Sequence, residues 1–454
     1  MINRLKELII DNKYPIGNYG IEREMLRVDE NGVLAFTPHP RGLGSKFENP
    51  YITTDFAESQ IEVITPAFQD SEKAFNFLND LYDIVAKEIG KEYLWPQSMP
   101  CEIPDDKEIP VAEFGTEKDA IDAKEYREKL LSKYGGKKQL ISGIHYNFSF
   151  SEELLKGLYA DECNEYTYKE FKNKVYLKVA RNYLRYRWIL IYLLGSSSIL
   201  HKSFIEDEDC TKCYKEVVKD TFIHEGGISY RNGECGYRNL VDLFPNYDSV
   251  GKYVESIEGF IKEKLIESHK ELYSQIRLKA NDPNKFLESL RQEGIKYLEY
   301  RTIDVNPFEK GGISLVDLEF LKVFNLFLLL KDESSYSQWQ EEALHNQNHV
   351  AKFGKNEVQL KRDGDNISKV QWALEILEEM QGISDKLQLD KENIINIMIE
   401  RVQEPELTYS YRIEEVVKKA GYINAYMALA KKYKEEANNN VELTETYSKV
   451  HQWL

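Results

Sequence analysis

The sequence predicts an α+β fold built on a mainly antiparallel sheet. Short stretches of alternating apolar and polar residues, typical of half-buried strands, are scattered along the 454-residue chain. Longer stretches with apolar residues at helical spacing separate them, without the regular strand–helix alternation of a parallel sheet. At roughly 100–200 residues per structural unit the length corresponds to two to four units. Neither an internal repeat nor a long linker divides the chain.

The elements expected in the first 150 residues alternate irregularly. Residues 1–14 have the spacing of a short amphipathic helix. Residues 19–28 and 59–65 alternate as strands, and the region between them is rich in glycine and proline. Residues 71–90 return to helical spacing. A proline-punctuated loop, a helix and an alternating strand complete this part, at residues 95–104, 121–134 and 140–150.

Helical spacing predominates after residue 150. The expected helical stretches cover about residues 151–200, 249–290, 314–345 and 366–436. A loop-rich section with several glycines is expected at residues 205–248, and one further strand, IKYLEYRTIDV, at residues 295–305. The core sheet therefore comes from about residues 15–150 and 290–310, with helical regions at about 151–290 and 311–454.

Charge and composition exclude several classes of partner. The net charge is −17, which disfavours nucleic acid and anionic membranes as partners. The longest apolar runs, near WILIYLLG and FNLFLLL, are far shorter than the ~20 residues that span a bilayer. The N-terminus has charges inside its apolar run and no small-residue cleavage site. With an odd number of cysteines, five, this indicates a reducing cytoplasm, where disulfides are rare.

The common short motifs do not account for a function. No GxxxxGK[ST] occurs, and RGLGSKF lacks the third glycine of a dinucleotide fingerprint. CTKC, residues 210–213, is a single CxxC without a second pair, so an incidental pair is favoured over a zinc or redox site. HNQNH, residues 345–349, lacks the glutamate of HExxH and is interpreted as a solvated helix face.

Four of the expected strands place ionisable side chains among apolar neighbours. Residues two apart on a strand share a face. The shared faces carry Glu22 with Glu24, Glu62, His145 with Asn147, and Glu299 with Arg301 and Tyr297. Arg23 points to the opposite face, where we expect it to pair with an acid. One such strand is ordinary for a sheet with one wet face, whereas four favour a shared polar cavity.

Converging carboxylates must bind cations or shift their pKa values strongly. Carboxylate-rich oxygen sites suit Mg²⁺ or Mn²⁺. Such ions bridge ATP phosphates in phosphoryl transfer. The strand pattern therefore favours a metal-dependent site that uses a phosphorylated ligand.

Several longer stretches of the chain are distinctive, among them GIEREMLRV, YITTDFAESQIEVITP, LWPQSMPC, QLISGIHYNFS, RNYLRYRWILIYLLGSS and GIKYLEYRTIDVNPF. In these stretches the chain resembles the bacterial glutamate–cysteine ligases, including those that form the front module of bifunctional glutathione synthetases. The stretches occur in the family's order, while residues 205–290 and the last quarter match loosely. The resemblance implies one catalytic unit over residues 1–454. It also implies an antiparallel sheet curled into a funnel, a glutamine synthetase-like catalytic core surrounded by helices.

The resemblance also implies a reaction. ATP phosphorylates the γ-carboxylate of L-glutamate, and the amine of L-cysteine attacks the acyl phosphate to give γ-glutamylcysteine, ADP and phosphate. This is the first step of glutathione biosynthesis. ATP and Mg²⁺ or Mn²⁺ are the implied cofactors, and a monomer is expected. Because no second ATP-binding module follows before Leu454, the bifunctional activity is not expected.

Residue by residue, the resemblance assigns roles to thirteen side chains, and Tyr297 joins them from its strand face. The implied metal ligands are Glu22, Glu24, Asp55, Glu62, His145 and Glu299. Arg301 meets the transferred phosphoryl group, beside Glu299. Gln139 and Arg231 match the glutamate site. Phe56, Tyr126, Arg127 and Tyr237 match the pocket for cysteine, and Tyr297 is the further expected substrate-binding residue. Plain packing remains the alternative for the tyrosines.

Three alternatives to this function stay open at this point. The same activation of glutamate could serve a different amine acceptor. A non-catalytic binding module could retain the scaffold, although the complete carboxylate set with Arg301 argues against it. A thiol redox protein could use CTKC.

Overall fold

A seven-stranded antiparallel sheet forms the centre of the computed structural model, which describes residues 1–160, 166–205, 210–440 and 444–454. Its strands are β1 (Gly17–Val28), β2 (Ile52–Thr54), β3 (Gln60–Ile64), β4 (Tyr93–Leu94), β5 (Ile144–Phe150), β9 (Ile276–Lys279) and β10 (Tyr297–Ile303). The order is β2-β3-β1-β5-β10-β9, with β4 paired to β1, and the sheet stays open at its ends. The expected α+β class with an antiparallel sheet is therefore confirmed.

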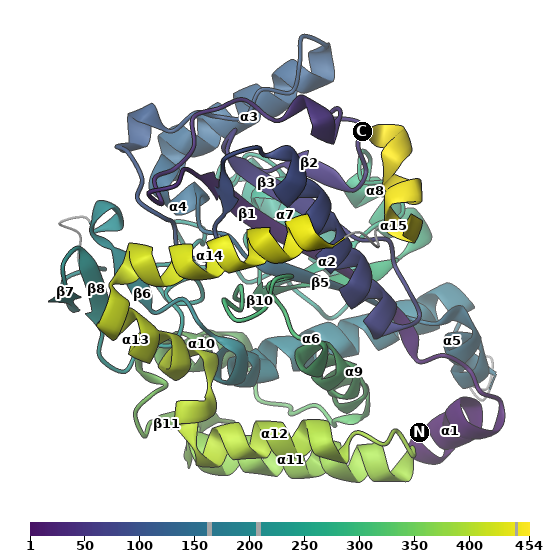
Figure 1. Cartoon of the computed structure of the whole chain (residues 1–454). Coiled ribbons are helices and arrows are strands. Elements are labelled where there is room, and N and C mark those ends of the chain that lie inside the picture. Colours follow the sequence, from purple (N-terminus) through teal and green to yellow (C-terminus); the bar gives the residue numbers. More distant parts are fainter. Residues whose placement is uncertain (161–165, 206–209, 441–443) are drawn as a thin grey trace.

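Helices surround this sheet in layers (Figure 1). Those of the first half are α1 (Ile2–Lys6), α2 (Ser71–Glu88), α3 (Lys118–Tyr134), α4 (Gly136–Gln139), α5 (Glu152–Tyr159), α6 (Tyr168–Leu194) and α7 (Val250–Lys262). Those that follow are α8 (Phe286–Glu293), α9 (Leu315–Leu330), α10 (Trp339–Phe353), α11 (Lys369–Lys386), α12 (Glu392–Gln403), α13 (Tyr409–Ala420), α14 (Tyr422–Asn439) and α15 (Thr444–Val450). Helices α2 and α6 pack on the sheet, and α9 packs on these two helices. Helices α11 and α12 form an outer layer against α9.

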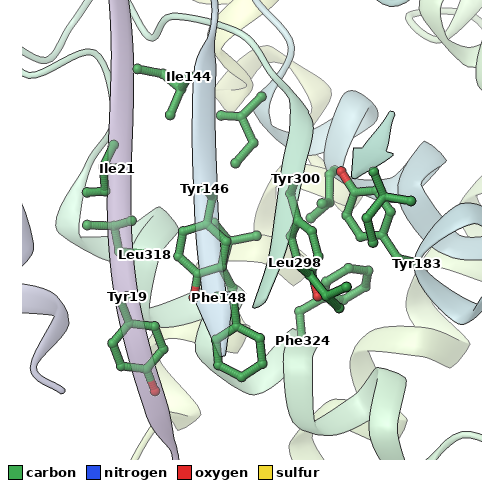
Figure 2. Packing of buried hydrophobic residues seen from close by; sticks show 14 of the residues in the cluster. Tyr19, Ile21, Ile144, Tyr146, Phe148, Tyr183, Leu298, Tyr300, Leu318 and Phe324 are labelled. Carbon is green, nitrogen blue, oxygen red and sulfur yellow. The ribbon is translucent and has the colours of Figure 1, made fainter. Parts of the chain in front are cut away.

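Aromatic residues dominate the sheet face that the helices cover (Figure 2). Tyr146 of β5 and Tyr300 of β10 are fully buried there, and the Tyr300 ring lies 4.1 Å from that of Tyr183 on α6. Asn325 of α9 joins the two strands, because it accepts from the Tyr300 hydroxyl at 2.8 Å and donates to the Tyr146 hydroxyl at 3.1 Å. The face is therefore an aromatic core in which Asn325 pairs the hydroxyls of Tyr146 and Tyr300, while the buried hydroxyl of Tyr19 has no hydrogen-bond partner among the described residues.

Arg23 lies on this covered face, as its strand position predicts, but the expected acid partner is wrong. It is fully buried, donates to the Lys310 carbonyl and lies 5.3 Å from the ring of Tyr82. No carboxylate of the described residues lies within salt-bridge distance of it. Burial therefore lowers the pKa of Arg23 to about 10.

Short strands are the elements that the sequence patterns did not predict. A three-stranded sheet has the order β6 (Ile199–His201), β8 (Thr221–His224), β7 (Tyr214–Val218). Strands β7 and β8 lie in the expected loop region, whereas β6 lies before it, at the end of a stretch expected to be helical. β9 lies inside a stretch expected to be helical, and β11 (Gln359–Arg362) forms a hairpin with β12 (Asp365–Ser368). Strands of three to five residues are too short for alternation to identify, and their partners decide their conformation.

A disulfide joins Cys210 and Cys235, against the expectation from the odd cysteine count. The two residues are separated by 25 positions, so their meeting depends on the path of the intervening β7–β8 hairpin. Cys101 and Cys213 are free thiols.

None of the helices in the described ranges is both long and apolar enough to cross a membrane.

Candidate active site

Antiparallel register brings the ionisable side chains of four strands onto one face of the main sheet. Glu22 of β1 lies opposite His145 of β5, and Glu24 lies opposite Glu62 of β3. Strand β10 adds Glu299 to the same cavity. Directly opposed residues of an antiparallel pair share a face. The separate strand patterns therefore form one cluster, as the sequence predicts.

His145 lies at the centre of this cluster. Its Nδ1 is 3.1 Å from a carboxylate oxygen of Glu22 and 4.0 Å from one of Glu299, and its Nε2 is 3.6 Å from one of Glu24. His145 belongs to two groups of side chains that could bind a metal ion. The first is Glu22, His145 and Glu299, and the second is Glu24, Glu62 and His145. Within each group the ligand atoms all lie within 4.8 Å of one another. Carboxylate oxygens with one imidazole nitrogen form a donor set suited to divalent cations.

Burial and like charge work against ionisation in part of this cluster. Burial, with Glu22 and Asp55 nearby, raises the pKa of Glu62 well above its ordinary value. Burial and the Asp55 carboxylate also raise the pKa of Glu24. Burial raises the pKa of Asp55 itself, although nearby guanidinium groups oppose the shift. Without bound cations the cluster therefore carries fewer charges than its carboxyl count, and cations would restore them.

The imidazole of His145 is neutral at physiological pH. Burial and the positive charge of Arg301 lower its pKa to about 4. The contact of Nδ1 with the Glu22 carboxylate assigns the proton to Nδ1, which leaves a lone pair on Nε2. Nε2 is buried without a hydrogen-bond partner in the described chain. An orphaned imidazole nitrogen beside Glu24 fits a bound metal ion.

Cationic side chains form the opposite wall of the cavity. Arg301 and Lys279 each contact a carboxylate oxygen of Glu299. Burial would raise the pKa of Glu299, but these two charges outweigh it and hold that pKa well below its ordinary value. Arg277 and Lys270 also line the cavity. The cavity is therefore bipolar, with the acids on β1 and β3 facing the cations of β9 and β10.

The cations of β9 are functional candidates that the sequence patterns missed. Arg277 and Lys279 are two residues apart on β9 and pair with Glu299 and Tyr297 of β10. The alternation of apolar and basic residues in IRLK, residues 276–279, indicates a strand. The spacing over residues 249–290 instead favoured helices, and this strand was therefore not predicted from the sequence.

Four residues of the expected substrate sites line the same cavity, namely Gln139, Arg231, Tyr126 and Tyr237. The Tyr237 hydroxyl donates to Oε1 of Gln139 at 2.8 Å, while the Gln139 amide nitrogen is buried without a partner in the described chain. Arg231 donates to the Ile303 carbonyl at 3.1 Å. Its guanidinium passes so close to Gly143 that a Cβ there would lie 2.0 Å from Nη2. This part of the cavity therefore offers the unpaired amide nitrogen of Gln139 to a substrate, while Arg231 also lies 3.9 Å from a carboxylate oxygen of Asp304.

Three further residues of the expected set lie outside the lining of this cavity. Phe56 is buried in an apolar cluster, at 3% exposure. Arg127 donates to the backbone carbonyl of Asp55 and lies 4.4 Å over the ring of Phe114. Tyr297 is half-buried, with the Lys279 ammonium 5.9 Å from its ring centroid. Arg127 therefore stabilises the backbone at Asp55 through this hydrogen bond and does not line the cavity itself.

Comparison with known proteins gives a consistent result along the chain. The glutamate–cysteine ligase family model matches residues 5–266 and 261–351. The glutamate–cysteine ligase of Clostridium acetobutylicum is 36% identical over 439 residues, covering 89% of this chain and 88% of that protein. The glutathione biosynthesis bifunctional protein GshAB of Clostridium perfringens is 39% identical over 447 residues, 97% of this chain. The chain spans 57% of that bifunctional protein's length.

Solved structures with the same fold include two relatives. A crystal structure of the glutamate–cysteine ligase of Francisella tularensis in complex with AMP matches at a TM-score of 0.88 and 28% identity, over 96% of this chain and 92% of that one. A bifunctional glutathione synthetase from Pasteurella multocida matches at 0.82 and 32% identity, over 96% and 54%. The family model, these relatives and the architecture agree that the chain belongs to the glutamate–cysteine ligase family.

Proposed function

We propose that the chain catalyses the ATP-dependent ligation of L-glutamate, through its γ-carboxylate, to the amine of L-cysteine. The reaction passes through γ-glutamyl phosphate and gives γ-glutamylcysteine. The observation that carries the proposal is the carboxylate cluster around His145, which faces Arg301 across a cavity that also contains Arg231 and Gln139. Membership of the family supports the same reaction.

The metal ions of this proposal are Mg²⁺ or Mn²⁺. Their ligands would be Glu22, Glu24, Asp55, Glu62, His145 and Glu299, of which all but Asp55 belong to the two ligand groups around His145. When bound, the ions would neutralise charge on the ATP phosphates. The neutral imidazole of His145 and the raised pKa values of Glu24 and Glu62 fit a site that gains its full negative charge only with cations present.

Arg301 is the proposed contact of the transferred phosphoryl group. A guanidinium offers two parallel donors to phosphate oxygens as their charge develops. The Glu299 carboxylate, which Arg301 contacts, holds that guanidinium against the sheet. Positioning and charge neutralisation, rather than a nucleophilic side chain, supply the rate enhancement in this scheme.

The substrates occupy the same cavity in this proposal. Arg231 pairs with the α-carboxylate of glutamate, and the free amide of Gln139 donates to it. Tyr126 and Tyr237 enclose the cysteine side chain. Phe56, Arg127 and Tyr297 lie outside the lining of this cavity, and of these three Arg127 would act on it indirectly, through its hydrogen bond to the Asp55 backbone.

ADP release with glutamate and a panel of amino acids tests this function. Cysteine should give the highest kcat/KM, above alanine and 2-aminobutyrate. ADP release that requires glutamate but is no faster with cysteine than with alanine would remove cysteine from the proposal. The absence of glutamate-dependent ADP release would overturn the ligation itself.

Three further assignments accompany the proposal. We assign one catalytic unit to residues 1–454, which is supported by a hydrophobic cluster that contains both Leu5 and Val450. We assign a monomer, because the proposed reaction requires no ligand or substrate contact beyond the residues that line this cavity. We assign a cytoplasmic location, because the proposed reaction consumes ATP and free amino acids.

A further inference from the structure

A buried carboxylate outside the metal cluster lies behind Arg231. Asp304 follows the last residue of β10 and is 1% exposed. One of its carboxylate oxygens lies 3.9 Å from Nη1 of Arg231. Arg231 lines the carboxylate cavity, whereas Asp304 is not among the residues that line it. Asp304 is therefore placed to act on the cavity through Arg231.

Hydrogen bonds fix the Asp304 carboxylate in place. One oxygen accepts from the backbone N–H groups of Ser196 and Ser197, at 3.0 and 3.2 Å, and from the Ser197 hydroxyl at 2.7 Å. The oxygen that faces Arg231 accepts from the side-chain amide of Asn232 at 3.2 Å. The Ser197 hydroxyl oxygen also accepts from the backbone N–H of Arg231 at 3.4 Å. The acid therefore has a fixed position and is linked to Arg231 through Ser197 as well as directly.

The Arg231 guanidinium lies between Asp304 and the metal cluster. Its Nη2 is close to Gly143, whose backbone N–H donates to the Glu24 carboxylate at 2.8 Å. Burial lowers the pKa of Arg231, while the carboxylates of Asp304 and Glu24 both oppose that shift. A buried cation is costly unless an opposite charge lies near it. Without Asp304 the remaining attraction would draw the guanidinium toward Glu24.

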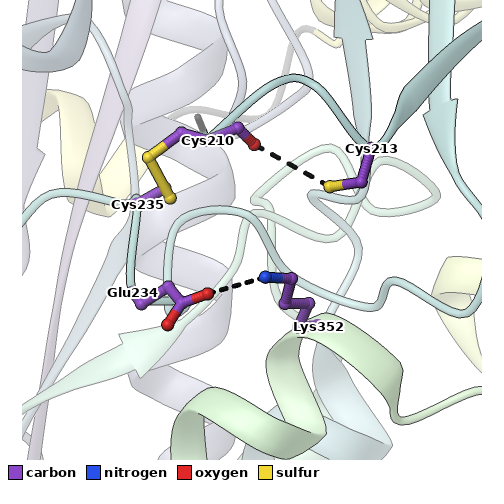
Figure 3. Close-up of a disulfide and its surroundings, with 5 residues drawn as sticks. All are labelled: Cys210, Cys213, Glu234, Cys235 and Lys352. Atoms are coloured by element: carbon purple, nitrogen blue, oxygen red, sulfur yellow. Dashed lines mark hydrogen bonds and ion pairs between the residues drawn. A yellow bond between two sulfur atoms is a disulfide. The ribbon is translucent and has the colours of Figure 1, made fainter. Parts of the chain in front are cut away.

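The backbone that carries Arg231 is held by contacts of its own (Figure 3). Glu234 pairs with Lys352 of α10 at 2.7 Å. Cys235 is joined to Cys210 by the disulfide. Neither contact involves the buried acid, so the path of this segment should survive replacement of that acid. The acid therefore determines the position of the guanidinium more than the position of the backbone.

We propose that Asp304 is a positioning residue for glutamate binding. Its charge holds the Arg231 guanidinium away from Glu24, so that the guanidinium stays available to the substrate α-carboxylate. This inference rests on the proposed function, which assigns that carboxylate to Arg231. The alternative is a purely structural acid, which stabilises the turn after α6. A structural acid predicts a loss of stability without a selective change in glutamate binding.

Asp304→Asn separates the two roles, because it removes the charge and keeps the shape of the side chain. Glutamate-dependent ADP release is measured with glutamate varied and then with ATP varied. We expect KM for glutamate to rise about tenfold, while KM for ATP and kcat stay within about threefold. The increase in melting temperature produced by glutamate should shrink in parallel. An unchanged KM for glutamate, or equal increases in the KM values for glutamate and ATP, would overturn the proposal.

Asp317→Asn is the matched control. Asp317 of α9 is also a buried acid beside a buried arginine, 3.3 Å from Nη1 of Arg401, and it lies outside the cavity lining. Its replacement should lower the melting temperature and leave KM for glutamate unchanged. If Asp304→Asn does not fold, Ser197→Ala decides, because it removes the shortest hydrogen bond to the Asp304 carboxylate. We expect Ser197→Ala to raise KM for glutamate about threefold, and an unchanged value would overturn the proposal.

The unmodified chain shows which of the two proposals fails. No glutamate-dependent ADP release by the unmodified chain would overturn the proposed ligation, and the role of Asp304 with it. Release by the unmodified chain with an equal KM for glutamate in folded Asp304→Asn would overturn the role of Asp304 alone.

Discussion

The two faces of the main sheet are built from the same strands and differ in almost every physical property. On β5, Tyr146 enters the aromatic core, while His145, its neighbour in sequence, enters the carboxylate cavity. On the covered face the polar atoms of Tyr146, Tyr300 and Asn325 are paired with one another. On the cavity face His145 Nε2 has no partner, and burial raises the pKa of Glu62.

This difference teaches how a functional cluster is tolerated. Buried like charges and an orphaned nitrogen are unfavourable for folding. The covered face compensates, because each strand that carries a carboxylate also carries a large apolar residue on its other side. We therefore expect substitutions on the cavity face to change activity, and substitutions on the covered face to change stability.

Glu62→Gln should give the largest effect, on activity. It removes one proposed metal ligand while keeping the shape of the side chain. We expect kcat/KM to fall about 10³-fold, within the range typical for loss of transition-state charge stabilisation. The melting temperature should stay equal or rise, because burial and neighbouring carboxylates disfavour the Glu62 charge. Glutamate-dependent ADP release and thermal unfolding measure the two quantities; full activity in this variant would contradict the metal assignment.

Phe148→Ala should give the largest effect on stability. The ring is fully buried on the covered face and lies 4.8 Å from the ring of Phe150. Its removal leaves a cavity and should lower the free energy of unfolding by about 3–5 kcal/mol. Denaturant unfolding checks the loss, with Phe148→Leu as the milder control. Activity of the folded variant at low temperature should stay within a few-fold of wild type; a selective loss of activity would show that the faces are not separable.

Asn325→Leu sharpens the comparison on the covered face alone. It leaves the buried hydroxyls of Tyr146 and Tyr300 without their partner, which should cost about 1–3 kcal/mol of unfolding free energy. Adding Tyr146→Phe and Tyr300→Phe to this variant removes the unpaired hydroxyls. We expect the triple variant to recover most of the loss; no recovery would mean that packing, rather than hydrogen bonding, accounts for the effect of Asn325.

Glu309 tests the cost of a half-buried carboxylate outside the metal cluster, and its effect should be the smallest. Burial and Asp317 raise its pKa to about 7 from an ordinary value of 4.5. Because the folded-state pKa is raised, its protonated form stabilises the fold at acidic pH. That contribution is lost as pH rises through about 7. Glu309→Gln should match wild type near pH 4 and be more stable at pH 8. Equal pH profiles of unfolding for both proteins would contradict the shift.

Much of the cavity could be predicted from strand periodicity, because residues two apart must share a face. That argument placed Glu22 with Glu24 and Glu299 with Arg301, and the structure brings both pairs into the cavity. Asp55 follows β2 in a turn, where no periodicity applies, and only the family resemblance indicated it. Arg277 and Lys279 lie on a four-residue edge strand, whose conformation depends on pairing with β10.

The sequence by itself determined the α+β class, the long strands and helices, and the face that each ionisable side chain takes, because these follow from local spacing. The tertiary structure alone decided which faces meet: the register that sets Glu22 opposite His145, and the packing that places Asp304 beside Arg231. Such contacts join residues far apart in the chain, and their geometry depends on the packing of the whole fold. Local sequence patterns therefore indicate which residues can belong to a site, and only the tertiary structure brings those residues together.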